Sequence, residues 1–189
     1  MQHDYAGMLT MTTAQAVTEL TGHITGRVLD IGCGSKPYKR MFPDLEWVGA
    51  DIRHVGDVVA DAENLPFGEE FDTVLCTNLL QYLDIPTLAM SEFARVLKPG
   101  GKLILITSAV HSTDPEVRCC FHARGLQALA NAVGMKVIHT SMGGRLFSAE
   151  WDGLVNVSKW NLPVPQNIGS ILETMDGRYP LVTSMVAQK

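Results

Sequence analysis

The sequence predicts an α/β fold in which a mostly parallel, seven-stranded sheet carries helices on both faces and an antiparallel strand at its edge. Two observations support this prediction. Short apolar segments that lack polar–apolar alternation recur along the chain, as expected for strands that are buried on both sides. Segments with apolar residues at helical spacing separate most of them, which is the order found in parallel sheets connected by crossover helices.

Seven segments have the composition of strands. In chain order they are residues 26–31, 45–51, 57–61, 71–77, 102–107, 135–139 and 179–187. We expect the last of them to close the sheet at its edge. The connection between the second and third segments is too short for a crossover helix. This part of the sheet is therefore predicted to be reduced, or one of the two segments is an extended loop.

Helical spacing of apolar residues predicts helices at residues 10–20, 84–97 and about 121–133, and a short helix that begins at Pro37. Asp84 is expected to cap its helix, and Pro86 suits a first helical turn. Residues 98–101, Lys-Pro-Gly-Gly, should end that helix. We interpret residues 1–189 as one domain, with an N-terminal helix or lid (1–25), a ligand-binding core (26–140) and a substrate-side insertion with the closing strand (141–189).

Composition excludes several classes of protein. Hydrophobic residues make up 46% of the chain and charged residues 19%, as in folded globular domains. The net charge of −5 argues against binding to a long nucleic acid. No segment has the apolar length of a membrane span. The four cysteines form no C-x-x-C pair and the histidines show no ligand spacing, so we expect reduced thiols, no metal site and a cytoplasmic protein.

The segment that organises the chain is Val28–Pro37, in which a buried strand ends in Asp30 and a turn containing Gly32, Cys33 and Gly34 follows. Glycine permits positive φ and a close approach of the backbone to a ligand. Polar residues also end three other strands, at Asp51, Asp61 and Asn78. Each acid could merely form a turn. In an open parallel sheet, however, all these residues reach the edge at which ligands bind.

The spacing of the glycines distinguishes two classes of ligand. A dinucleotide site has the pattern G-x-G-x-x-G, in which the third glycine allows close helix–strand packing. Here Pro37 stands at the third position, and no phosphate loop ending in Gly-Lys-Ser/Thr is present. Asp51, about twenty residues beyond Asp30, suits a ribose diol, because a carboxylate can accept hydrogen bonds from two hydroxyls.

Five motifs, in order, resemble those of the class I S-adenosylmethionine-dependent methyltransferases, and in particular a type 11 methyltransferase domain. They are Asp30-Ile-Gly-Cys-Gly34, Gly49-Ala-Asp51, residues 61–67, residues 71–78 and residues 95–105. Residues 122–126 and 132–137 are also similar to a later helix and strand of the family. The resemblance spans about residues 26–140 and implies a Rossmann-like, doubly wound sheet with S-adenosylmethionine as cofactor and S-adenosylhomocysteine as product.

Carried over to this chain, the resemblance implies a role for each matching residue. The backbone of Gly32, Cys33 and Gly34 would lie against the methionine moiety, with Asp30 near its amino group or ordering the turn. Asp51 would bind the ribose hydroxyls. At the adenine ring, Ile52 would contact the face, Asp61 would accept from the amino group, and the backbone of Ala62 would meet a ring nitrogen. Asn78 would lie beside the methionine end and face the acceptor.

A sulfonium carries its own leaving group, so alignment of the acceptor can supply most of the rate. A general base is needed only for a protonated acceptor. His111 is the first candidate and His122 and Tyr82 follow, although a loop histidine can equally be a surface residue. The family often has an acid or histidine near the position of Gln81, which puts a catalytic role at that position in doubt.

We therefore expect a methyltransferase that transfers a methyl group to a small molecule by in-line displacement. Two alternatives stay open: a protein or RNA methyltransferase, and a methyltransferase-like binding module without catalysis. The acceptor is expected to meet residues 1–5, 110–121 and 143–167. The aromatic residues of the last segment could form a lid, cover the sheet edge or form a homodimer contact.

Overall fold

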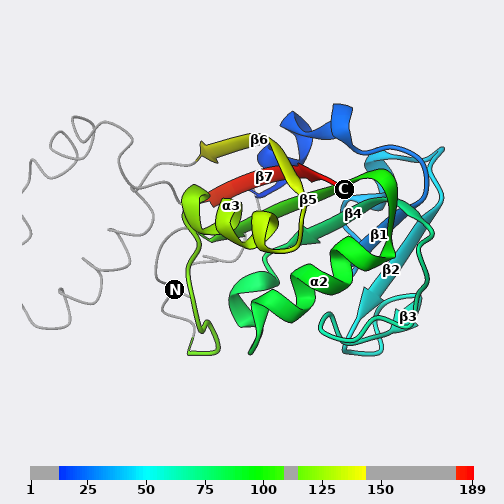
Figure 1. The fold of residues 1–189 in the computed structure, drawn as a ribbon. Helices are drawn as coiled ribbons and strands as arrows, with labels where there is room; N and C mark the ends of the chain where they lie inside the picture. Colours follow the sequence, from blue (N-terminus) through cyan, green and yellow to red (C-terminus); the bar gives the residue numbers. More distant parts are fainter. Residues whose placement is uncertain (1–12, 109–114, 144–181) are drawn as a thin grey trace, which may run out of the picture.

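In the computed structural model, which describes residues 13–108, 115–143 and 182–189, the chain forms a seven-stranded sheet with helical segments on both faces (Figure 1). The strand order is β3-β2-β1-β4-β5-β7-β6. The strands are β1 (Val28–Ile31), β2 (Trp47–Asp51), β3 (Val58–Val59), β4 (Phe71–Thr77), β5 (Leu97–Ser108), β6 (Lys136–Gly143) and β7 (Val182–Gln188). The predicted fold class is confirmed.

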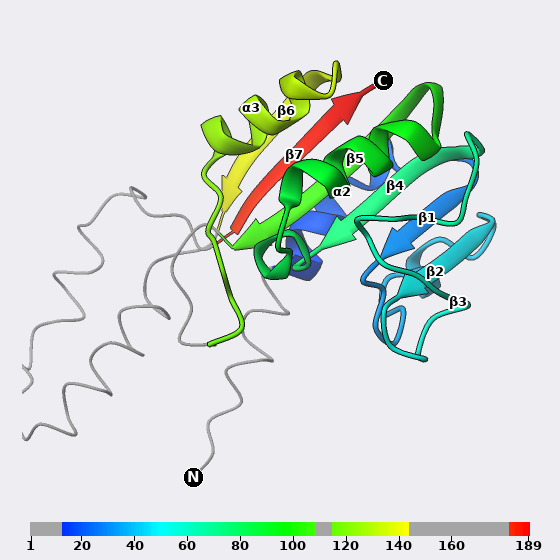
Figure 2. The same cartoon turned by 60° about the horizontal axis from the view of Figure 1, so that its bottom comes forward.

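The position of the last strand differs from the prediction. β7 pairs antiparallel with both β5 and β6, so it lies inside the sheet, and β6 is the edge strand (Figure 2). The β7 residues from Val182 to Ala187 are all buried, with no alternation of buried and exposed positions. Burial of this kind is typical of an interior strand, so the interpretation of residues 179–187 as the edge strand was wrong.

The two faces of the sheet are buried by different parts of the chain. Leu29 and Ile31 of β1 face α2 (Pro86–Val96) and α3 (Ala123–Ala132), whose buried side chains belong to the same core cluster. Val28 faces the other side and packs with Val17 from the helical residues 13–19. Successive strand residues point to opposite faces, so β1 contributes to both cores, which explains its nearly continuous apolar sequence.

Helix ends depart from the sequence expectations in three places. α2 has Ile85 as its N-cap residue with no side-chain cap. Asp84 lies one residue before the N-cap, and its carboxylate pairs with Arg118. Residues 98–101 follow α2 as predicted but already belong to β5. The helix expected after Pro37 is only a 3₁₀ turn, η2 (Lys39–Met41). Two further 3₁₀ turns are η1 (Thr21–His23) and η3 (Leu80–Tyr82).

The connection between β2 and β3 contains no helix, and β3 is reduced to two residues. Asp57 fixes this short connection, because its backbone N–H donates to the Gly49 carbonyl at 2.7 Å and its carboxylate accepts from the Gly49 N–H at 2.8 Å. Lys36 pairs with the same carboxylate. Gly56 makes the close approach feasible, since a Cβ there would lie 2.7 Å from the Gly49 oxygen. The reduced sheet edge is thus as predicted.

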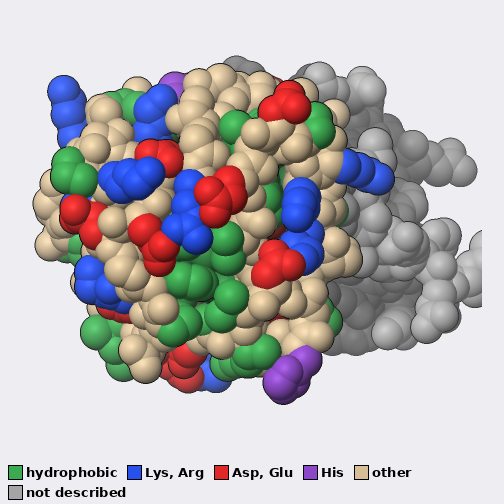
Figure 3. Space-filling view, turned by 90° about the vertical axis from the view of Figure 1, so that its right-hand side faces the viewer, with side chains coloured by type: hydrophobic (Ala, Val, Ile, Leu, Met, Phe, Trp, Pro, Cys, Tyr) green, Lys and Arg blue, Asp and Glu red, His purple; other side chains and the backbone are tan. Residues whose placement is uncertain are grey.

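The edge of the sheet at which the parallel strands begin carries charged side chains of both signs (Figure 3). Arg27 pairs with Glu46 and Glu70 and stacks over the Phe71 ring, and Lys98 pairs with Asp72 at 2.9 Å. Mixed charges give no field of one sign over this edge.

Among the described residues, no helix is long and apolar enough to cross a membrane.

Replacing Gly56 with alanine should destabilise the fold by about 1–3 kcal/mol, because the added methyl group overlaps backbone atoms that cannot rotate away. Urea denaturation followed by circular dichroism measures this free energy of unfolding. The matched control is Gly125→Ala in α3, where a Cβ meets nothing within 4 Å. That change should stabilise the chain by about 0.5–1 kcal/mol through helix propensity. Equal effects of the two substitutions would contradict the tight connection.

Candidate functional site

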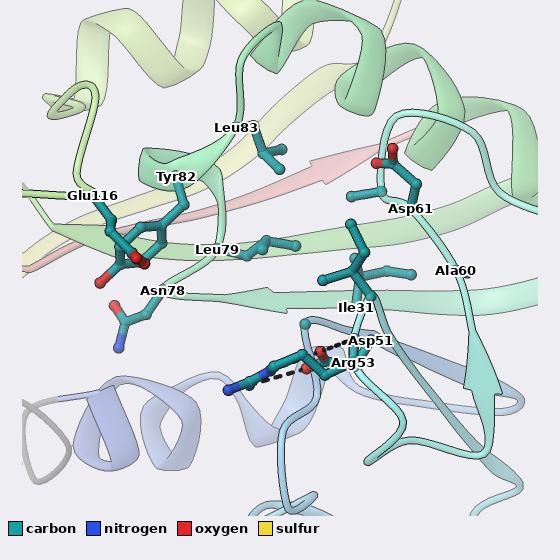
Figure 4. Close-up of a pocket in the computed structure, with 13 residues that line it drawn as sticks. Ile31, Asp51, Arg53, Ala60, Asp61, Asn78, Leu79, Tyr82, Leu83 and Glu116 are labelled. Carbon is teal, nitrogen blue, oxygen red and sulfur yellow. Dashed lines mark hydrogen bonds and ion pairs between the residues drawn. The ribbon is translucent and has the colours of Figure 1, made fainter.

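A cavity of about 470 Å³ opens at the edge where β1, β2 and β4 end (Figure 4). Glycine-turn backbone, acidic side chains and an amide contribute to its lining, together with apolar side chains. The lining residues are Ile31, Gly32, Asp51, Ile52, Arg53, Ala60, Asp61, Ala62, Asn78, Leu79, Tyr82, Leu83 and Glu116. The carboxyl ends of parallel strands are where open α/β sheets bind ligands, so this cavity is the candidate site.

The glycine turn is attached directly to the end of β2. The N–H groups of Gly32 and Cys33 donate to the Ala50 carbonyl at 2.8 and 3.2 Å, and the Gly34 N–H donates to Asp51 Oδ2 at 3.0 Å. Gly32 and Gly34 have φ of 67° and 49°, which favours glycine. A Cβ on Gly32 would also lie 3.0 Å from Leu79 on the cavity wall. The turn therefore presents bare backbone to the cavity.

Asp51 is held in a fixed orientation at the end of β2. Its side chain is 4% exposed, and Oδ1 accepts from the Arg53 N–H at 2.9 Å and from Arg53 Nε at 3.1 Å. Burial acts to raise the pKa of this carboxyl, but the hydrogen bonds from Arg53 and Gly34 outweigh it and lower the pKa below its ordinary value. The carboxylate is therefore an anionic acceptor at neutral pH.

All three residues predicted for adenine line the cavity. Ile52 is an apolar side chain that is 69% exposed, which is the condition expected of a residue that covers an aromatic ring in a complex. Ala62 is buried, and Asp61 is exposed with one oxygen accepting from the Glu63 N–H at 2.9 Å. Its second oxygen is not used in that bond. These residues can thus offer an apolar face and a carboxylate.

Asn78, Tyr82 and Glu116 lie at the opposite end from Asp61 (Figure 4). Asn78 has a φ of 50°, and its side-chain amide donates to Thr13 Oγ1 at 2.9 Å. The start of the described N-terminal helix is therefore attached to the end of β4. Tyr82, a candidate base in the sequence, lines the cavity. The cavity thus has one end beside Asp61 and a second polar end beside Asn78.

Several predicted residues do not line the cavity. The Cys33 side chain is buried against β2, where its sulfur would lie 2.9 Å from a Cβ on Gly49. Burial raises the pKa of its thiol to about 11. Gly34 acts through its bond to Asp51. His122 is exposed at the start of α3. His111, the first catalytic candidate, lies outside the described residues.

Gln81 stabilises the site through hydrogen bonds and does not line the cavity. It is buried, its Oε1 accepts from the Thr107 hydroxyl at 2.7 Å, and its backbone carbonyl accepts from the Arg118 N–H at 2.9 Å. These bonds tie η3 to β5 and to the segment before α3. Gln81 therefore orders the end of the cavity that Tyr82 lines, and no catalytic role is assigned to it.

The sequence interpretation missed Arg53, Leu79 and Glu116 as lining residues. Arg53 stands two positions beyond Asp51, so its proximity could have been inferred from the strand end. Leu79 likewise follows Asn78 directly. Glu116 comes from a loop far along the chain, and no local pattern indicates it. Within residues 13–108, 115–143 and 182–189, no three His, Cys, Asp or Glu side chains are arranged to hold a metal ion.

The donors and acceptors of the cavity fit S-adenosylmethionine. An oriented carboxylate at Asp51 matches a ribose diol, the apolar surface of Ile52 matches a purine face, and the bare turn at Gly32 leaves room for a methionine chain. The cavity lining, among the described residues, holds no cluster of cations of the kind that binds a pyrophosphate. The geometry therefore favours a nucleoside without a diphosphate, as the missing third glycine predicts.

Asp30 lies beneath the turn as a nearly unpartnered buried acid. It is 1% exposed, Oδ2 accepts from Trp47 Nε1 at 3.3 Å, and Oδ1 has no hydrogen-bond partner among the described residues. Burial raises its pKa to about 7, against smaller opposing effects of Trp47 and Lys36. The carboxyl group therefore holds its proton over a wider pH range in the folded chain than in the unfolded chain.

Asp30 should make the wild-type chain less stable as the pH rises from about 4 to about 7. In this window the folded state keeps a proton that the unfolded state has lost, so unfolding releases a proton and becomes easier as the pH rises. Above the window, the loss of unfolding free energy due to Asp30 no longer changes with pH. The free energy of unfolding of Asp30→Asn minus that of wild type should grow by about 1 kcal/mol or more between pH 4.5 and 7.5. Urea titrations at both pH values measure it, and a constant difference would contradict the raised pKa.

Comparison with known proteins finds similarity to methyltransferases over part of the chain. The family described as "Methyltransferase domain" matches residues 29–105. A tRNA (carboxymethyluridine(34)-5-O)-methyltransferase of Arabidopsis thaliana is 35% identical over 101 residues, 46% of this chain and 25% of that protein. A malonyl-[acyl-carrier protein] O-methyltransferase of Alcanivorax borkumensis is 33% identical over 97 residues, 41% of this chain and 33% of that protein. The chain thus matches a third or less of the length of these relatives.

Solved structures confirm the fold. The methyltransferase in the complex with the Trm112 methyltransferase activator of Haloferax volcanii superposes with a TM-score of 0.71 at 17% identity, covering 97% of this chain and 92% of that one. This likeness concerns the fold alone. Together with the family match over residues 29–105 and the similar curated proteins, it confirms the resemblance to the class I S-adenosylmethionine-dependent methyltransferases that the five motifs carry.

Proposed function

We propose that the chain catalyses transfer of the methyl group of S-adenosylmethionine to a small-molecule acceptor, with S-adenosylhomocysteine as the second product. The observation that carries this proposal is the cavity lined both by the oriented Asp51 carboxylate and by the polar end at Asn78, with the glycine turn between them. The relatives act on different acceptors, so the family match alone supports only the reaction class.

Each end of the cavity has a role in this proposal. Asp51 binds the ribose hydroxyls, and the bonds from Gly34 and the Arg53 backbone orient it for this purpose. Ile52 covers the adenine ring, while Asp61 and the backbone of Ala62 bind its polar edge. The bare turn at Gly32 accommodates the methionine chain, which leaves the reactive end near Asn78.

Catalysis requires little covalent chemistry from the protein. The bound cofactor supplies the methyl group together with its leaving group, a neutral thioether. The residues of the chain hold the acceptor in line and exclude water, and orientation of this kind can supply several kcal/mol of the barrier. Tyr82 and Glu116 line the acceptor end, where a hydroxyl and a carboxylate can position an acceptor that carries O–H or N–H groups. His111 stays a candidate base.

The small-molecule acceptor is supported by charge. The chain has a net charge of −5, and Arg53 is the only Lys or Arg among the described residues that line the cavity. A nucleic acid would require basic surface along its backbone. Incubation with labelled S-adenosylmethionine and fractionated extract tests both points. Label in small molecules supports the proposal, label in RNA or protein overturns the acceptor class, and no transfer despite cofactor binding indicates a binding module.

Substitution of Asp51 with alanine should weaken binding of S-adenosylmethionine by about tenfold or more, because a hydrogen bond to a charged group contributes about 1.5–3 kcal/mol. Isothermal titration calorimetry measures the dissociation constant of each variant. The matched control is Asp44→Ala, which removes an exposed acid before β2, at the opposite edge of the sheet. Unchanged affinity in Asp51→Ala would remove Asp51 from the site.

A further inference from the structure

Arg53 uses the same oxygens of Asp51 that a ribose diol would need. Its Nε donates to Oδ1 at 3.1 Å and its Nη2 donates to Oδ2 at 3.4 Å. The guanidinium therefore spans both carboxylate oxygens, as a pair of hydroxyls would. Figure 4 shows the side chain lying beside Asp51, with dashed lines between the two groups. Arg53 itself is one of the lining residues of the cavity.

The remaining bonds to Asp51 come from the backbone. The Gly34 N–H donates to Oδ2 at 3.0 Å and the Arg53 N–H donates to Oδ1 at 2.9 Å. Two carboxylate oxygens offer about four lone-pair positions, and these two backbone bonds with the two side-chain bonds occupy them. A diol can reach both oxygens only after the guanidinium has left, whereas the backbone bonds can persist.

Arg53 is able to leave. Its side chain is 71% exposed, against 4% for Asp51, and Asp51 is its only ion-pair partner within the part of the chain that the structure describes. The Arg53 guanidinium already lies mostly in water, so it loses little net Coulomb energy when it leaves the pair. The buried Asp51 carboxylate, in contrast, must receive replacement donors, and a ribose diol supplies them.

We infer that Arg53 is an internal competitor for the ribose site, which holds Asp51 paired until a nucleoside displaces its guanidinium. This inference rests on the proposed function, in which Asp51 binds the ribose. Arg53 would then lower the affinity for both cofactor and product, because it competes with their ribose for Asp51. Both S-adenosylmethionine and S-adenosylhomocysteine carry the same diol, so Arg53 would weaken both and speed release of the product.

Substitution of Arg53 with alanine should tighten binding of S-adenosylhomocysteine by about two- to fivefold, the range that corresponds to loss of an exposed ion pair. Isothermal titration calorimetry measures it. Arg124→Ala is the matched control, because it removes an equal charge from an exposed position in α3 away from the cavity lining, and it should leave the affinity unchanged. Adding Arg53→Ala to an Asp51→Ala chain should bring no gain.

The salt dependence of adenosine binding is a second test, measured on the wild-type chain and on Arg53→Ala. Adenosine carries the diol and no charge, so its affinity for the wild-type chain should rise as sodium chloride screens the Arg53–Asp51 pair. The affinity of Arg53→Ala for adenosine should be independent of salt. Weaker or equal binding by Arg53→Ala, with wild type binding measurably, would overturn the competitor role alone. Absence of binding to wild type would overturn the proposed function, and this inference with it.

Discussion

The attachment of the glycine turn to the end of β2 determines the rest of the site. Two N–H groups of the turn bind the Ala50 carbonyl and a third binds the Asp51 carboxylate. The floor of the cavity and the Asp51 carboxylate therefore form one rigid unit. Because β1 and β2 are also paired in parallel over Asp30 and Gly49, neither part can shift without breaking the centre of the sheet.

Most of this arrangement could be predicted from sequence because it depends on local signals. Buried parallel strands have apolar runs that end at polar residues, and this pattern alone predicts that Asp51, Asp61 and Asn78 share one edge of the sheet. The structure brings all three to one cavity. The short connection after β2 likewise predicted a reduced edge. These features require only chain order, strand composition and the rule that parallel strands end on the same side.

Other features depend on contacts between distant segments and could not be predicted. The interior position of β7 follows from its pairing with β5 and β6, and an apolar strand at the end of a chain does not by itself specify its neighbours. Asp84 is a reasonable helix cap, but α2 begins one residue later, with Ile85 as its N-cap, and Asp84 pairs with Arg118. Glu116 reaches the cavity from a loop whose position depends on the backbone bonds to Gln81.

The absence of a helix between β2 and β3 links the fold to the behaviour of the site. The short connection, fixed by Asp57 and Gly56, leaves Ile52 largely exposed and the nucleoside end of the cavity open to water. An acid at an open site would attract cations from solvent, and Arg53 from the same connection already pairs with it. In the proposed function, affinity at this end is therefore a balance between the Arg53 guanidinium and the ribose hydroxyls, which both donate to the Asp51 carboxylate. Burial of Ile52 by a purine would then supply free energy that favours the nucleoside, about 25 cal/mol per Å² of apolar surface.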